Sequence, residues 1–166
     1  MTNETEKKWR TPGRGDFTFD EVCDAIKKFI VQNKQDEYKI SVGSDAQKHK
    51  GFTRFVTAIM VHHVGKGGQY YVLTEDVQFI SSLRQKIMHE VGLTYQYKEM
   101  LKDELGDFLK ENNIHIKPHA DIGEYGDTKK LINEIKGMFK GFGQEEEVEI
   151  KPYSNAASSI ANKHSK

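Results

Sequence analysis

Three acidic residues that lie far apart in the sequence could together carry out metal-dependent chemistry. They are Asp45, Glu90 and Asp121. Carboxylate oxygens are the ligands that hard cations such as Mg²⁺ and Mn²⁺ prefer. Two such ions held ~3.5–4 Å apart stabilise the attacking and the leaving oxygen when a phosphodiester bond is cleaved. We therefore treat these residues as candidate metal ligands and catalytic residues.

The expected position of each acid within its element supports this hypothesis. Asp45 and Asp121 each lie opposite the aliphatic set of their strand, because side chains alternate along a strand. If the two strands are parallel neighbours, both acids project from one face at the carboxyl ends, where ligands usually bind. Glu90 lies beside Val91 and three residues after Ile87, at the border of the buried face of its helix.

Each acid also has an ordinary structural explanation, and the residues alone leave both interpretations open. Asp45 could be a turn aspartate after a strand, and Asp121 could begin the loop to the next helix. Glu90 could be a helical glutamate that only meets solvent.

Neighbouring polar residues are candidates for substrate binding. His119 precedes Asp121 by two residues and should point the same way, so it could ligate a metal, orient a phosphate or shuttle a proton. Gln47 and His49 follow Asp45 closely and could contact a phosphate, and Lys151 could contact nucleic acid. The alternatives are a histidine packed on the sheet, a solvated turn, and a segment that only prepares the last helix.

Hydrophobic periodicity and capping signals define the elements that must position these residues. Thr18 and Glu21 form a capping box before a first helix, and Ser82 and Gln85 form another before a long one. Helices are expected at about 19–33, 82–111, 128–140 and 154–163, and strands at about 38–42, 52–64, 69–79, 114–122 and 148–151. Glycines 92 and 106 could interrupt the long helix, and Pro118 predicts an irregularity or a strand edge.

Length and composition set the limits of the protein class. The 166 residues fit one domain at 17–166, after a polar segment 1–16 that we expect to be a flexible leader. Lysine and arginine balance aspartate and glutamate at 25 each, which excludes a strongly basic nucleic-acid arm. Cys23 is the only cysteine, so a four-cysteine zinc site is excluded and a reducing cytoplasm is the simplest compartment. No apolar run approaches the ~18 residues of a membrane span.

The order of elements and several short motifs resemble a known family. Three meander strands followed by alternating helix and strand is the layout of the ribonuclease H-like fold. The motifs are Gly43-Ser44-Asp45-Ala46-Gln47, Glu90, His119-Ala120-Asp121-Ile122-Gly123 and the segment from Lys151-Pro152-Tyr153-Ser154 to Asn162. Together they look like the bacterial YkuK-type family of ribonuclease H-like proteins, whose members are mostly uncharacterised.

The resemblance implies an α/β fold and a site. The fold is a five-stranded mixed sheet flanked by helices, here with an extra N-terminal helix. In the wider superfamily, acids matching Asp45, Glu90 and Asp121 bind two divalent metals and cut phosphodiester bonds. A fourth acid or histidine usually comes from the last helix. This chain has no acid after Glu149, which departs from the pattern, and Asn162 and His164 are the candidate metal ligands there. A frayed terminus is the alternative for His164.

Two main hypotheses of function follow. The first is a Mg²⁺- or Mn²⁺-dependent nuclease or nucleic-acid-processing phosphodiesterase, acting on RNA or DNA. The alternative is a non-catalytic ribonuclease H-like module that binds nucleic acid or protein, which the missing fourth acid motivates. A nucleotide-handling protein is a third hypothesis, but such enzymes normally need a second lobe.

Overall fold

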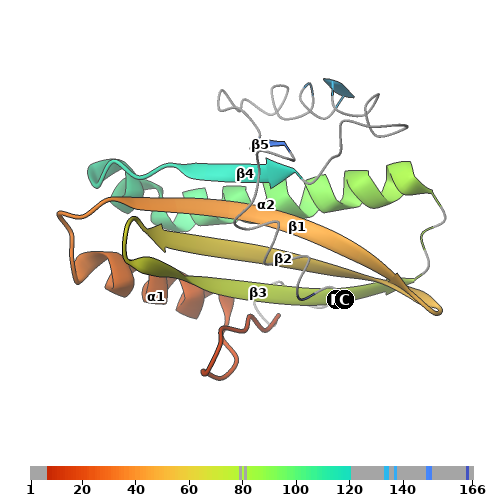
Figure 1. Ribbon diagram of the computed structural model, residues 1–166, viewed down its shortest axis with the longest axis horizontal. Helices are drawn as coiled ribbons and strands as arrows, with labels where there is room; N and C mark the ends of the chain where they lie inside the picture. The colour runs from red at the N-terminus through yellow and green to blue at the C-terminus, as the bar shows by residue number, and fades with distance from the viewer. Residues whose placement is uncertain are drawn as a thin grey trace.

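The protein is a mixed sheet with two helices packed on one face. The computed structural model describes residues 7–78, 80, 82–120, 133–134, 137, 149–150 and 164. In chain order the elements are α1 (Phe19–Val31), β1 (Tyr38–His49), β2 (Phe52–His63), β3 (Gly67–Gln78), α2 (Leu83–Glu111), β4 (Ile116–Ala120) and the two-residue β5 (Glu149–Ile150) (Figure 1). The mixed α/β class is confirmed. Of the fifth strand expected at about 148–151, the structure describes two residues, Glu149 and Ile150.

Local sequence signals explain the ends of both helices. The Thr18 side chain accepts a hydrogen bond from the Glu21 N–H and the Glu21 carboxylate accepts one from the Thr18 N–H, so the predicted capping box begins α1. Ser82 caps α2, which runs unbroken through Gly92 and Gly106. At the end of α2, Asn113 has a φ of 56°, and the next N–H closes the helix on the Leu109 carbonyl at 2.8 Å.

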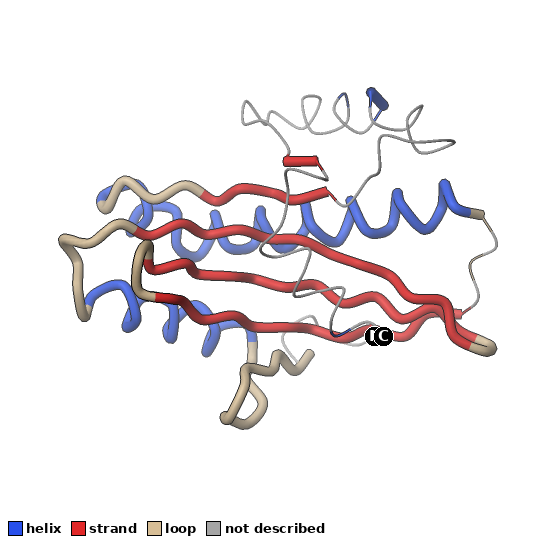
Figure 2. The backbone as a smooth tube through the Cα atoms, viewed as in Figure 1, coloured by secondary structure: helices blue, strands red, loops and turns tan. Residues whose placement is uncertain are grey.

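The strand order is β3-β2-β1-β4-β5. β1, β2 and β3 form an antiparallel meander of long strands joined by tight turns (Figure 2), and β4 pairs with β1 in parallel. The β1–β4 register ends at Gly43 and His119, so β1 continues for six residues beyond it. Pro118 lies inside β4, paired with Val42, and the β4–β5 ladder begins one residue later, which agrees with the expected edge.

The main core lies between the sheet and the helices. One face of β1, β2 and β3 contributes Ile40, Val42, Phe55, Ile59, Tyr71 and Leu73, and the helices contribute Ile26, Ile30, Leu101 and Leu105. α1 and α2 contact each other on this face, and Figure 1 shows both on the same side of the sheet. A smaller apolar cluster lies on the other face and contains Val56, Ala58 and Val72.

The segment before α1 differs from the expected flexible leader. Trp9 is fully buried, with its ring 5.0 Å from that of Tyr97 and 6.2 Å from that of Phe19. Its backbone pairs with Phe17, and Arg10 forms two 2.8 Å backbone hydrogen bonds with Val72 of β3. At Trp9 and Arg10 this segment is therefore packed against the domain and covers part of the β3 edge, whereas residues 12–16 are exposed.

Candidate functional site

Asp45 lies within β1 and not after it. The sequence suggested a strand that ends near Val42, but β1 extends to His49 because the whole stretch pairs with β2, where Asp45 faces Val56. Its half-buried side chain lies on the sheet face opposite the helices, as alternation predicted. Asp45 is also two residues beyond the end of the β1–β4 ladder. The acid is thus at the point where β4 no longer pairs with its strand.

Glu90 is buried on α2, with an exposed fraction of 7%. One turn further along the helix, the Thr94 hydroxyl donates a 3.1 Å hydrogen bond to the Ser44 hydroxyl, which also shares a 3.1 Å hydrogen bond with Thr57. These three buried hydroxyls fix α2 against β1 and β2. One of them, Ser44, is the residue immediately before Asp45. Glu90 therefore lies near the Asp45 segment of β1, on the helix side of the sheet.

His119 completes the described part of this region. It is buried, it pairs in register with Gly43, and by alternation it shares the face of Asp45. On its other side it lies in register with Glu149 of β5. The structure thus brings Asp45, His119 and the helix turn of Glu90 to the end of the β1–β4 ladder.

The remaining predicted site residues are distributed more widely. Gln47 is exposed on β1, and the His49 ring is stacked on Phe52 with a centroid distance of 4.9 Å, so both lie in the β1–β2 hairpin. His164 lies over β3, with its ring 5.7 Å from that of Tyr70, which does not favour a role beside Asp45 two strands away. Asp121, Lys151 and Asn162 lie outside the described residues.

Whether this region could hold a metal ion depends on which donor atoms its side chains provide. Two carboxylates and a histidine suit a hard divalent cation in donor chemistry. Within the described ranges, however, no group of three or more His, Cys, Asp or Glu side chains is placed to hold a metal ion. Asp45 and Glu90 carry suitable oxygen donors, but Asp45 lies on the face opposite the helices and Glu90 on the helix side, and the described residues do not bring them into one ligand group.

Sequence reasoning missed several polar residues around this region. Ser44, Thr57 and Thr94 form the buried hydroxyl network, and Lys98 is buried two turns after Glu90 on α2. The spacing of Glu90, Thr94 and Lys98, four residues each, places them on one side of the helix and was the available signal. Burial on that side depends on packing against β1 and could not be read from the spacing.

Comparison with known proteins identifies the family of the chain. The sequence profile of the family described as Ribonuclease H-like matches residues 21–166. The chain belongs to the ribonuclease H-like family. A relative from Bacillus subtilis (strain 168), called uncharacterized protein YkuK, is 32% identical over 160 residues, which covers 90% of this chain and 92% of the relative.

The family match includes the three predicted acids, since all of them fall within residues 21–166. No solved structure gives a significant match to the chain. Among the described residues, no helix is long and apolar enough to cross a membrane.

Proposed function

We propose that the protein is a divalent-metal-dependent phosphodiesterase that acts on nucleic acid. The observation that carries the proposal is the position of Asp45 and Glu90 around the end of the β1–β4 ladder. Asp45 lies two residues beyond Gly43, the last residue of β1 that pairs with β4. Glu90 lies one helical turn from the Thr94–Ser44 hydrogen bond. Family membership supports the same class of function.

The burial of Glu90 argues against its ordinary explanation. A glutamate that serves only to solvate a helix remains exposed, whereas Glu90 is 7% exposed on the face that packs against the sheet. Placing a carboxylate there costs free energy unless nearby groups compensate its charge.

The roles of the chain's own residues follow from their faces. Asp45, from the face opposite the helices, and Glu90, from the helix side, would supply oxygen ligands around the ladder end, and Asp121 is the expected third ligand. When bound, Mg²⁺ or Mn²⁺ would lower the pKa of a water molecule and neutralise charge on the phosphate. His119, on the same face as Asp45 and two residues away by register, would orient a phosphate oxygen.

The proposal is tested by cleavage of labelled single-stranded RNA, single-stranded DNA and an RNA–DNA hybrid in Mg²⁺ or Mn²⁺. Asp45→Asn and Glu90→Gln should each lower the rate by ~10²-fold or more, equivalent to about 3 kcal/mol of transition-state stabilisation. Asp103→Asn, which changes an exposed acid of α2, is the matched control and should cleave like the wild type. Equal cleavage by Asp45→Asn and wild type would indicate a contaminating nuclease.

A non-catalytic binding module is the second candidate. It is favoured by the finding that no cluster of three potential ligands occurs among the described residues. It predicts nucleic-acid binding that persists in EDTA with no turnover of any of the three substrates. Absence of cleavage by the wild type in both metals would therefore replace the first proposal with this one.

A further inference from the structure

A cavity of about 500 Å³ lies beside the edge strand β3, away from the acids. Its described lining is rich in cations and includes Lys7, Lys8, Arg10, Arg54, Glu75 and His164. Four of these side chains carry a full positive charge and one a negative charge. In a chain whose lysines and arginines equal its acids in number, this is a local excess of positive charge.

The segment before α1 is what brings two of these cations to the cavity. The Arg10 backbone pairs with Val72, whose side chain belongs to the small apolar cluster on the face opposite the helices. Side chains alternate along an extended segment, so Trp9 enters the main core while Lys8 and Arg10 lie on the other side. The burial of Trp9 thereby fixes the position of both cations.

The ion pairs of these side chains leave part of the positive charge available. Lys7 is paired with Glu75 at 2.6 Å, and Arg54 forms a bidentate pair with Asp76 at 2.8 and 3.0 Å. The bond from Arg54 lowers the pKa of Asp76 below its ordinary value, so that pair stays charged at neutral pH. Lys8 is exposed, and Arg10 meets Asp16 only at 3.3 Å with both side chains largely in solvent, where such a pair is weak.

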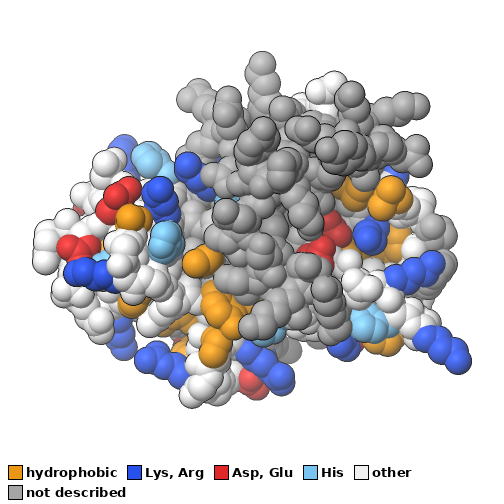
Figure 3. Space-filling model, in the orientation of Figure 1, with side chains coloured by type: hydrophobic (Ala, Val, Ile, Leu, Met, Phe, Trp, Pro, Cys, Tyr) orange, Lys and Arg blue, Asp and Glu red, His pale blue; other side chains and the backbone are white. Residues whose placement is uncertain are grey.

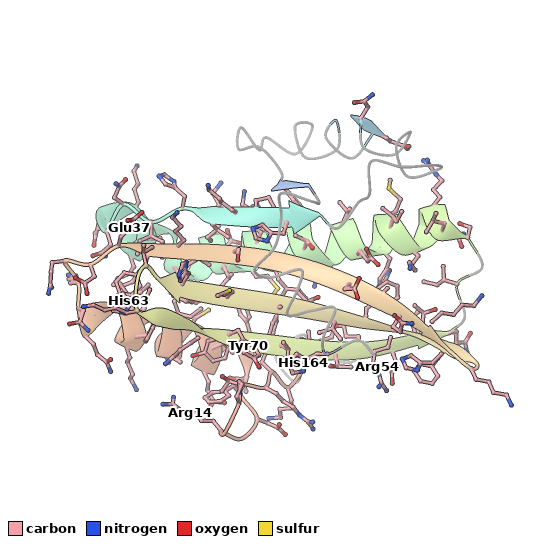
Figure 4. The ribbon with its side chains drawn as sticks, in the orientation of Figure 1. Arg14, Glu37, Arg54, His63, Tyr70 and His164 are labelled. Carbon is pink, nitrogen blue, oxygen red and sulfur yellow. The ribbon has the colours of Figure 1, made fainter. Side chains whose placement is uncertain are left out.

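Aromatic rings accompany the cations along the same strand. Tyr70 contacts His164, and it also lines a second cavity of about 270 Å³ together with Arg14 and Tyr71. Figure 4 shows Tyr70, His164 and Arg54 one after another along the lower edge of the sheet, with Arg14 below them on the segment before α1. In Figure 3, lysine and arginine side chains appear along the margin of this face. Cations that follow a groove together with aromatic rings are typical of single-strand nucleic-acid binding.

We propose that the two cavities along β3 bind the phosphate backbone of a single-stranded nucleic acid. The larger is lined by Lys8, Arg10 and Arg54 and the smaller by Arg14 and Tyr70, and we call the two together the β3 groove. The inference rests on the proposed function, for which it names the substrate class.

The distance from the groove to Asp45 is consistent with one bound strand. Thr74, which lines the larger cavity, Val56 and Asp45 form one row across β3, β2 and β1. Two strand spacings of ~4.8 Å separate the ends of this row by ~10 Å.

The test is fluorescence anisotropy with a labelled twelve-nucleotide RNA and its DNA equivalent, in EDTA so that cleavage does not contribute. Lys8→Gln with Arg10→Gln removes two exposed cations and should raise Kd about tenfold and reduce the slope of log K against log salt by about 1.4. The matched control is Lys28→Gln with Lys102→Gln, two exposed lysines on the helices, which should bind within twofold of wild type. Thermal melting of each variant verifies folding, and Arg14→Gln provides an independent third change.

The outcomes separate this inference from the proposed function. Loss of binding confined to the groove variants supports the groove whether or not the wild type cleaves. Equal binding by the groove and control variants overturns it even if Asp45-dependent cleavage is found. Competition by polyglutamate as effective as by the oligonucleotide would also overturn it, because the groove would then select acidic polypeptides equally well.

Discussion

Replacing Trp9 with alanine should destabilise the whole domain. The Trp9 side chain is fully buried and contacts the rings of Phe19 and Tyr97. Removing a tryptophan from such a site costs about 3–5 kcal/mol, from lost burial and the remaining cavity. For a chain of 166 residues this corresponds to a fall in Tm of roughly 6–20 °C, at ~2–4 °C per kcal/mol.

Urea unfolding followed by far-UV circular dichroism measures this loss, since Trp9 is the single tryptophan and its fluorescence disappears with it. The matched control is Val31→Ala at the end of α1, where the side chain is 53% exposed and the change should stay within ~0.5 kcal/mol. A loss below ~1 kcal/mol for Trp9→Ala would refute the reasoning and restore the flexible leader that the sequence suggested. A full loss should also weaken oligonucleotide binding, because Trp9 fixes the neighbouring cations Lys8 and Arg10.

Three further predictions concern buried and paired groups. In a double-mutant cycle of Ser44→Ala and Thr94→Val, urea unfolding should give a coupling of about 0.5–1.5 kcal/mol, and additive effects would contradict a direct hydrogen bond. The hydrogen bond with His63 and that from Lys66 lower the pKa of Asp36, so its contribution is present above the unfolded carboxyl pKa and is lost as the pH falls through the folded value. Asp36→Ala should therefore be less stable than wild type at pH 7 and approach it near pH 2, whereas a pH-independent difference in thermal melting would contradict this. Burial raises the pKa of the Cys23 thiol to about 12, so a thiol reagent at pH 8 should react slowly with the folded protein and rapidly in urea; equal rates would contradict its burial.

The features predicted correctly are those that depend on residues close together in the sequence. The capping box at Thr18 and Glu21 and the cap at Ser82 act within a few residues, and both helices begin where these signals predicted. Alternation placed Asp45 on the face opposite the aliphatic residues of β1, because side-chain direction in a strand depends only on parity. These features were predictable because the residues that cause them are neighbours in the sequence.

Other features of the candidate site depended on tertiary structure. Gly43-Ser44-Asp45 suggested the end of a strand, yet β1 continues because β2 pairs with it as far as His49. The burial of Glu90 and Lys98 depends on how α2 packs against β1, and polar residues at helical spacing do not reveal this.

The amino-acid sequence by itself determined the family, the starts of α1 and α2 and the identity of the candidate acids, whereas the helices expected at 128–140 and 154–163 lie largely outside the described residues. Only the tertiary structure decided that Trp9 belongs to the core, that its neighbours Lys8 and Arg10 line a cavity with Arg54, and that His164 lies over β3. The physical reason is that burial and charge clustering come from contacts between residues distant in sequence. A polar segment such as residues 7–16 carries too little local pattern to indicate which of its side chains the fold will bury.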